Sequence, residues 1–287
     1  MVKKIGFIGA GVMGKSMIRN LRKNGFDVTV YSRTKEKTED IIAEGAPWAD
    51  SAGECAKGQD VVITIVGYPK DVEEVYFSEN GILANAAPGA VLIDMTTSSP
   101  QLAEKIYAAA KEKGLHALDA PVSGGDSGAK AGTLSIMVGG DEDVMKSVMP
   151  VFEAMGKTIM YEGGAGCGQH TKMANQIALS GCLASVCEAI TYARKAGLDT
   201  DRMFSSISTG AVSSWQLSNN GPKILKDDYA PGFFIKHYIK DMKIACEEAD
   251  RNGANLPILG QVLQMFENLD EQGMGELGTQ ALIKYYE

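Results

Sequence analysis

The sequence predicts an α/β protein: a doubly wound parallel sheet at the N-terminal end, followed by an all-helical domain. Two observations predict this class. Through the first half of the chain, short apolar runs alternate with amphipathic stretches, as in βαβ units. After residue 161 no strand pattern is convincing, and helical patterns continue to the C-terminus. We therefore place one domain at residues 1–163 and a second at 164–287.

Seven strands are expected in the first domain. The run Val61 to Val66 is apolar on both faces, as a strand covered by helices on both sides must be. Amphipathic stretches at 100–113 and 141–155 are expected to be helices between strands. The expected strands lie at 4–8, 28–31, 61–66, 91–95, 116–120, 134–138 and 158–161.

The second domain begins after a glycine-dense segment at 162–168. A proline-free stretch of mostly small and apolar residues follows at 170–196, and Gly197 is a suitable helix stop. We expect one long, largely buried helix there. Further helices are expected at 200–208, 235–252, 257–272 and 279–286.

Composition excludes several classes of protein. Of 287 residues, 28 are Lys or Arg and 36 are Asp or Glu, so the net charge is −8, which disfavours a nucleic-acid binder. Five cysteines show no paired spacing, so neither disulfides nor a metal site is expected, and free thiols fit a reducing compartment. We find no signal segment and no apolar run near the ~18 residues of a membrane span. A cytoplasmic protein without membrane or nucleic-acid partners is expected.

A glycine motif follows the first expected strand and opens a helix. It consists of Gly9, Ala10, Gly11, Val12, Met13 and Gly14. In this context the glycines allow a tight turn, close approach of a pyrophosphate and close helix–strand packing, as in Rossmann-like dinucleotide sites. The alternative is a glycine turn without a ligand.

The end of the second strand bears on the choice of nucleotide. It reads Ser32, Arg33, Thr34, with no carboxylate until Glu36. NAD binders usually place an acid there, whereas an arginine can pair with a 2′-phosphate. We therefore expect NADP in preference to NAD; the alternative is a solvated basic turn. Two further strand ends, with Val66–Gly67 and Thr96, are expected beside the nicotinamide, although such turns are common.

Three groups of residues are candidates for the chemistry. Ser123, Gly124 and Gly125 follow a strand and can present N–H groups and a hydroxyl to a carboxylate. Lys172 and Asn175 share one face of the long helix, where a partly buried lysine can donate a proton. Lys240 and Asp241 lie early in a later expected helix, at 235–252. The alternative for residues 123–125 is a plain turn. For Lys172 it is a lysine that snorkels to solvent, and for Lys240 and Asp241 it is a surface salt bridge. His170 is expected to be a hinge or cap residue and Cys167 a passive small residue.

Four motifs in order, at 9–14, 119–125, 163–175 and 240–245, resemble the β-hydroxyacid dehydrogenase family, which includes 3-hydroxyisobutyrate dehydrogenase and tartronate semialdehyde reductase. The resemblance is closest to bacterial NADP-type glyoxylate and succinic semialdehyde reductases. It implies that Lys172 is the catalytic lysine and that Asn175 orients substrate or lysine. It also implies that residues 123–125 hold the substrate carboxylate, that Thr96 contacts the nicotinamide ribose, and that Lys240 and Asp241 close the site. One departure is Gln176, where some members have a second asparagine.

The resulting expectation is an NADP-preferring oxidoreductase that interconverts a small 3-hydroxy (or 2-hydroxy-3-oxo) acid and its semialdehyde. The resemblance also implies a homodimer or homotetramer. The alternatives are a non-catalytic NADP-binding sensor on the same fold, an imine reductase-like enzyme and a 6-phosphogluconate dehydrogenase.

Overall fold

The chain folds into two compact units in a computed structural model that describes residues 2–287. The units comprise Met1–Lys172 and Met173–Glu287. Helix α10 (Cys167–Lys195) begins in the first unit and continues into the second. The expected domain boundary after residue 163 lies just before this helix and stays a prediction.

One mixed sheet forms the centre of the first unit. Its strands within residues 2–287 are β1 (Lys4–Ile8), β2 (Asp27–Tyr31), β3 (Val61–Thr64), β4 (Val91–Asp94), β5 (His116–Asp119), β6 (Val122–Ser123), β7 (Leu134–Gly140) and β8 (Gly156–Gly163). The order is β2-β1-β3-β4-β5-β7-β6, with β8 beside β7. The pairs from β2 to β5 are parallel, whereas β7 runs antiparallel to β5 and β6. The predicted doubly wound α/β class is confirmed. The expectation of a sheet that is parallel throughout is wrong at β7, which runs antiparallel to its neighbours β5 and β6, and the short β6 is an additional strand.

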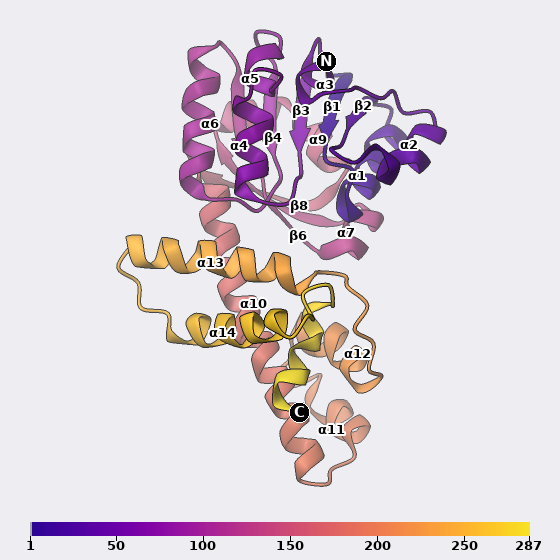
Figure 1. Cartoon of the computed structure of the whole chain (residues 1–287), viewed down its shortest axis with the longest axis vertical. Coiled ribbons are helices and arrows are strands. Elements are labelled where there is room, and N and C mark those ends of the chain that lie inside the picture. Colours follow the sequence, from indigo (N-terminus) through magenta and orange to yellow (C-terminus); the bar gives the residue numbers. More distant parts are fainter. Residues whose placement is uncertain (1) are drawn as a thin grey trace. The chain divides into compact units, whose positions relative to one another are not determined.

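Helices cover both faces of this sheet, as Figure 1 shows for α4, α5 and α6 beside β3 and β4. In β3, Val61 and Ile63 enter one apolar cluster with α1, while Val62 enters another with α3 to α6. This alternation explains why the strand is apolar throughout. The helices are α1 (Val12–Lys23), η1 (Lys35–Thr38), α2 (Glu39–Ala43), α3 (Ala52–Ala56), α4 (Pro69–Phe77), α5 (Ile82–Asn85), α6 (Pro100–Glu112), α7 (Gly125–Ala131), α8 (Glu142–Ser147) and α9 (Met149–Glu153).

The single helix expected at 141–155 is instead two helices, α8 and α9. Pro150 is the reason, because proline has no N–H to continue the hydrogen bonds of α8 and its ring clashes with the carbonyl group four residues earlier. The chain leaves helical geometry at Val148, whose φ and ψ are −109° and 13°, and Pro150 then occupies the first turn of α9.

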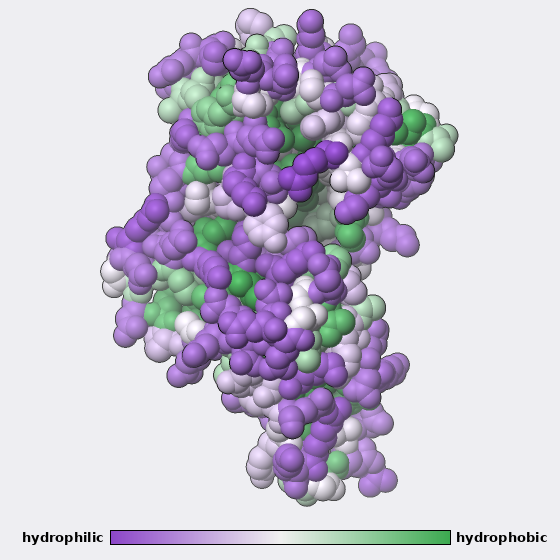
Figure 2. All heavy atoms as spheres, in the orientation of Figure 1, coloured by the Kyte–Doolittle hydropathy of each residue, from purple (hydrophilic) through white to green (hydrophobic). Residues whose placement is uncertain are grey.

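Helices packed around the second half of α10 form the second unit. They are α11 (Thr200–Ile207), the π-helix η2 (Gln216–Asn220), α12 (Gly221–Leu225), α13 (Ile235–Arg251), α14 (Pro257–Glu271) and the 3-10 helix η3 (Thr279–Tyr286). Their core includes Leu183 and Cys187 of α10, Tyr238 and Met242 of α13, and Phe266 of α14. The predicted helical second domain is confirmed. The face of the molecule in Figure 2 is mainly hydrophilic, with apolar residues in scattered groups.

Helix α10 corrects one expectation. Within residues 2–287 it is long and apolar enough to cross a membrane by length and composition, with a mean hydropathy of 1.2 over its most apolar window. The sequence reading missed this because Ala, Cys, Ile and Leu are interspersed with polar residues rather than forming one run. A core helix passes the same test, and 44% of that window is buried. Leu183, Cys187 and Ile190 are fully buried in the core of the second unit, which accounts for the composition.

The start of α10 packs tightly on the sheet at Gly168, which yields a prediction. A Cβ on Gly168 would lie 2.4 Å from the carbonyl oxygen of Met137 and 2.6 Å from that of Asp119. Gly168→Ala must therefore push the helix away, and we expect a loss of about 1–3 kcal/mol of stability in urea unfolding. Gly164→Ala is the control, because a Cβ there meets nothing within 4 Å. Equal unfolding midpoints for the two variants would contradict this account of the packing.

Candidate active site

The loop between β1 and α1 carries the glycine motif. Gly9 has φ of +106°, and a Cβ there would lie 2.1 Å from the carbonyl oxygen of Ile65, so the position requires glycine. A Cβ on Gly14 would lie 2.0 Å from the Gly9 oxygen, whereas a Cβ on Gly11 would meet nothing within 4 Å. Gly9 and Gly14 therefore serve the turn and its packing, and the space beside Gly11 is open to a ligand.

This open space lies at the N-terminus of α1. Gly11 is the N-cap residue and brings no side-chain oxygen, and the first turn reads Val-Met-Gly-Lys, without an acid. The N–H groups and the positive end of the helix dipole therefore favour an anion. Ala10 is buried and Val12 is exposed in the same loop. These residues fit the pyrophosphate of a dinucleotide.

Arg33, just beyond β2, has a partner that the sequence reading missed. Its Nη1 lies 3.0 Å from Oδ1 of Asp71, in the first turn of α4. Oδ2 of Asp71 accepts a hydrogen bond from the Tyr68 N–H at 3.1 Å, so the carboxylate is fixed. The Arg33 side chain remains 78% exposed. The guanidinium is therefore held at one edge and open at the other. The only sequence signal for Asp71 is its place in the first turn of a helix that begins at Pro69.

The loops after β3 and β4 are joined by a buried polar network. The Val66 N–H donates to Oγ1 of Thr96 at 3.0 Å, and the Thr96 N–H donates to Oδ1 of Asp94 at 3.1 Å. Oγ1 of Thr64 donates to the same carboxylate oxygen at 2.8 Å. Thr96 is buried, so the structure gives it a role in fixing these loops. Its contact with a cofactor, and those of Val66 and Gly67, stay predictions.

Asp119, at the end of β5, holds the start of α10. Its two carboxylate oxygens accept hydrogen bonds from the Gly166 and Gln169 N–H groups, both at 2.8 Å. Gln169 in turn donates to the carbonyl oxygen of Thr96 at 2.7 Å and accepts from the Ser98 N–H at 3.0 Å. The first turn of α10 is therefore fixed to the ends of β4 and β5. Sequence reasoning missed both roles, because each joins residues far apart in the chain.

Lys172 follows on the next turn of this anchored helix. It is 6% exposed, and its Nζ donates to the carbonyl oxygen of Val122 at 2.8 Å. Val122 directly precedes Ser123, so the lysine is bonded to the strand that leads into the predicted carboxylate loop. The alternative of a lysine that snorkels to solvent is wrong, whereas its catalytic role stays a prediction. In the first turn of α10, before Lys172, His170 is exposed and Cys167 is half-buried.

The predicted carboxylate loop joins β6 to α7. Gly124 and Gly125 have φ of +131° and +62°, so the backbone turns sharply after Ser123. Ser123 and Gly125 are half-buried and Gly124 is exposed. The loop is therefore accessible at its tip and held at its base by Lys172.

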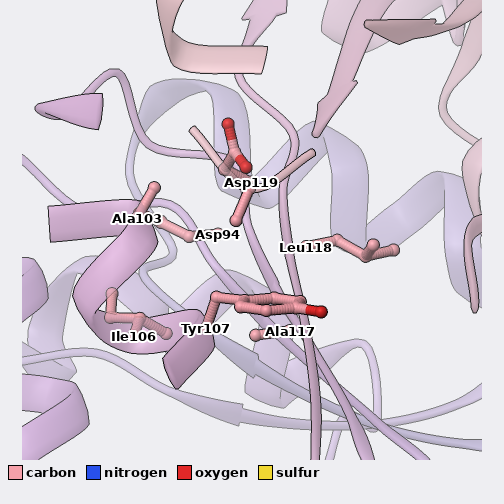
Figure 3. A pocket seen from close by; sticks show the side chains of 8 residues that line it. Asp94, Ala103, Ile106, Tyr107, Ala117, Leu118 and Asp119 are labelled. Atoms are coloured by element: carbon pink, nitrogen blue, oxygen red, sulfur yellow. The ribbon is translucent and has the colours of Figure 1, made fainter. Parts of the chain in front are cut away.

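A small cavity lies beside Asp119, and Figure 3 shows the side chains that line it. It has a volume of about 10 Å³, room for one water molecule. Its walls are Asp94, Ala103, Ile106, Tyr107, Ala117, Leu118, Asp119 and Ala165. Burial raises the pKa of Asp94 to about 6, against the hydrogen bonds from Thr96 and Thr64 that lower it. Burial also raises the pKa of Asp119, against its hydrogen bonds from α10. The cavity is too small for a substrate.

In the second unit, Asn175 of α10 is linked to Asp241 of α13 through Gln176. Nδ2 of Asn175 donates to Oε1 of Gln176 at 2.8 Å, and Nε2 of Gln176 donates to Oδ2 of Asp241 at 2.6 Å. Nζ of Lys240 lies 2.7 Å from Oδ1 of Asp241. The structure thus joins Asn175, Lys240 and Asp241, and it corrects the alternative of a surface salt bridge, because Asp241 is only 2% exposed.

Comparison with known proteins agrees with these features over the whole chain. Residues 4–163 match the family described as the NAD binding domain of 6-phosphogluconate dehydrogenase. Residues 166–286 match the family described as NAD-binding of NADP-dependent 3-hydroxyisobutyrate dehydrogenase. An uncharacterized oxidoreductase of Bacillus subtilis is 54% identical, covering 100% of this chain and 99% of the relative. The chain belongs to the 3-hydroxyisobutyrate dehydrogenase-like family of β-hydroxyacid dehydrogenases.

Members of this β-hydroxyacid dehydrogenase family with named activities are also similar. The 2-hydroxy-3-oxopropionate reductase of Escherichia coli is 37% identical, covering 99% of this chain and 97% of the relative. An NAD-dependent L-serine dehydrogenase of Pseudomonas aeruginosa is 35% identical, covering 100% and 98%. The structure of 3-hydroxyisobutyrate dehydrogenase with L-serine from Mycobacterium tuberculosis has a TM-score of 0.90 at 31% identity, covering 99% of both chains. The chain is therefore an oxidoreductase that binds NAD(P).

The buried Asp94 predicts a pH-dependent stability. Its folded-state pKa of about 6 lies above the ordinary value of 3.8, so the folded protein binds the extra proton and loses stability as pH rises through this window. Asp94→Asn keeps an acceptor for Thr64 and Thr96 without the buried charge. We expect it to gain about 1–3 kcal/mol at pH 7.5 and much less at pH 4.5, measured by urea unfolding.

Asp143→Asn is the control for Asp94→Asn, because the Asp143 side chain is fully exposed. A gain for Asp94→Asn that is equal at both pH values would show that ionisation of Asp94 is not its source.

Proposed function

We propose that this protein is an NADP-preferring reductase and dehydrogenase that interconverts a small 3-hydroxy acid, or a 2-hydroxy-3-oxo acid, and its semialdehyde. The placement of Lys172 carries the proposal. Its buried ammonium is bonded to the strand that leads directly into the loop of Ser123, Gly124 and Gly125. A proton donor and a carboxylate-binding loop are thus held together.

Each group has a defined task in this reaction. NADP(H), when bound at the glycine loop, supplies or accepts the hydride. The N–H groups and hydroxyl of residues 123–125 bind the substrate carboxylate and so orient the carbonyl group. Lys172 stabilises the negative charge that develops on the carbonyl oxygen and transfers a proton to it. In the oxidation, Lys172 accepts the proton of the hydroxyl group. For Asn175, Lys240 and Asp241, a role toward the substrate is implied by the family resemblance alone.

The named relatives support this substrate class. The Escherichia coli relative is a 2-hydroxy-3-oxopropionate reductase, and the Mycobacterium tuberculosis structure contains L-serine, a 3-hydroxy acid. An imine reductase of Myxococcus stipitatus shares the fold only, at 16% identity and a TM-score of 0.67. A lysine that can give a proton to oxygen suits a carbonyl substrate, which argues against an imine reductase. A non-catalytic sensor would not need that lysine, which argues against the sensor. The cytoplasmic location and the homodimer or homotetramer stay predictions.

NADP is proposed over NAD because of Arg33. The exposed edge of its guanidinium can pair with a 2′-phosphate, and Asp71 already orients the group. The end of β2 carries no acid to bind the ribose hydroxyls. The Pseudomonas aeruginosa relative, by contrast, is NAD-dependent.

A substrate panel tests the reaction class. We expect the protein to oxidise NADPH with at least one of glyoxylate, succinic semialdehyde, tartronate semialdehyde and methylmalonate semialdehyde. Lys172→Ala should lose at least about 100-fold in kcat, the usual contribution of a general acid, and should still bind NADPH in a fluorescence titration. Lys195→Ala, an exposed lysine on the same helix, is the control. No turnover with any compound would favour the sensor, and full turnover by Lys172→Ala would remove Lys172 from the mechanism.

Arg33→Asp tests the cofactor preference. It replaces a cation near the proposed 2′-phosphate by an anion, so the KM for NADPH should rise by at least about tenfold while that for NADH changes little, since a charge-assisted hydrogen bond contributes about 1.5–3 kcal/mol. Arg202→Asp, another exposed arginine, should change neither KM. Equal losses for both cofactors would show that Arg33 does not bind the phosphate.

A further inference from the structure

Asp94 is a buried ionisable group that the proposed reaction does not use. It is the last residue of β4 and is 4% exposed. Its Oδ1 accepts hydrogen bonds from the Thr96 N–H at 3.1 Å and from the Thr64 hydroxyl group at 2.8 Å. The side chain of Thr96 also donates to this carboxyl group. Burial nevertheless raises the pKa of Asp94 to about 6, so its ionised form costs the fold stability at neutral pH.

A continuous series of contacts leads from Asp94 to the glycine turn between β1 and α1. Oγ1 of Thr96 accepts a hydrogen bond from the Val66 N–H at 3.0 Å, so the loops after β3 and β4 are joined. The loop after β3 packs directly against Gly9, because a Cβ there would lie 2.1 Å from the Ile65 carbonyl oxygen and 3.3 Å from Cγ1 of Val66. All of these residues belong to the first unit. The position of the β3 loop therefore bears on the turn that is expected to bind the pyrophosphate.

We propose that Asp94 is a positioning residue for the dinucleotide: through Thr96 and Val66 it holds the β3 loop against the glycine turn and so fixes the shape of that turn before NAD(P) binds. An ionised carboxylate accepts hydrogen bonds on both oxygens. A neutral carboxyl or amide group in its place has one acceptor oxygen fewer, and its hydrogen bonds are weaker than charge-assisted ones. It therefore holds Thr96 less firmly. This role requires only NAD(P) binding, and not the reaction proposed above.

Substitutions of Thr96 test the link to Val66. Thr96→Val keeps the shape of the side chain and removes the acceptor of the Val66 N–H, whereas Thr96→Ser retains that oxygen. The Kd for NADPH should rise about two- to tenfold in Thr96→Val, because a loop that has lost a hydrogen bond must be ordered again on binding. Thr96→Ser should stay near the wild-type value. Thr191→Val is the control, since it removes a hydroxyl group that donates to the Cys187 carbonyl oxygen at 2.9 Å in the second unit.

ADP distinguishes this positioning role from a direct contact of Thr96 with the nicotinamide ribose. It carries the pyrophosphate but neither nicotinamide nor the attached ribose, so the loss of a direct contact would leave its affinity unchanged. A disturbed glycine turn should instead weaken ADP and NADPH by the same factor, measured by isothermal titration calorimetry. Weaker binding of NADPH alone in Thr96→Val, or unchanged binding of both ligands, would overturn the positioning role.

Asp94→Asn separates positioning from a purely structural role. Without the buried charge the variant should be more stable at pH 7.5, yet it should bind NADP about two- to tenfold more weakly there, as for the loss of one hydrogen bond. Loss of packing alone would lower stability and affinity together. As pH falls through about 6, wild-type Asp94 takes up a proton and comes to resemble the variant. The ratio of the variant Kd to the wild-type Kd should therefore fall toward one at pH 5.

Within the part of the chain that the structure describes, the other titratable groups around Asp94 are Tyr76 of α4, Tyr107 of α6 and Asp119 of β5. They are present in wild type and variant alike, as are the phosphate groups of the ligand, so the direction of the change depends on Asp94. The midpoint belongs to Asp94 and Asp119 together, because two carboxyl groups beside one cavity titrate as a pair.

A Kd ratio for Asp94→Asn that does not change with pH, or wild-type affinity of this variant at pH 7.5, would overturn the role of the carboxylate. Failure of the wild type to reduce any panel compound would instead overturn the proposed function alone, because binding of NADP and ADP needs no substrate.

Discussion

The capping of α10 by Asp119 is the interaction on which the candidate site depends. A helix N-terminus leaves backbone N–H groups without partners, and a buried carboxylate is unfavourable without donors. Asp119 and the N-terminus of α10 satisfy each other's hydrogen-bonding groups, because both carboxylate oxygens accept hydrogen bonds from N–H groups at the start of α10 at 2.8 Å. The register of the helix on the sheet is thereby fixed, and with it the position of Lys172 one turn later. Gln169 strengthens the anchor by bonding to the β4 loop on both its donor and its acceptor sides.

An acidic chain that binds an anionic cofactor needs positive groups at the binding site itself. With a net charge of −8, its overall field does not attract a dinucleotide. The structure instead offers the uncapped N-terminus of α1 and the guanidinium group of Arg33. The pair of Arg33 with Asp71 is largely exposed, so it adds little to stability. The pair orients the guanidinium group, and an arginine that is already oriented would lose less entropy on binding the 2′-phosphate proposed above.

The fold was predictable from the sequence where local pattern decides the structure. The apolar runs located the parallel strands, and the glycine motif located the turn into α1. The split of the helix at Pro150 is also encoded locally, by the proline itself. Other features depend on residues distant in sequence: the antiparallel β7, the Asp119 cap 47 residues from Gly166, and the pairing of Arg33 with Asp71. No periodicity or spacing indicates such pairs, because tertiary packing brings them together. Sequence motifs therefore predicted the candidate site residues, but not the side chains and backbone groups to which these residues are hydrogen-bonded.

Residues 176 and 241 have to be considered together when members of this family are compared. Gln176 reaches the carboxylate of Asp241 at 2.6 Å while its other end meets Asn175. An asparagine at 176 has one methylene fewer, so from the same backbone it cannot span both partners. One of the buried groups would then lose its hydrogen bond, at a cost of about 1–3 kcal/mol, unless another residue or a water replaced it.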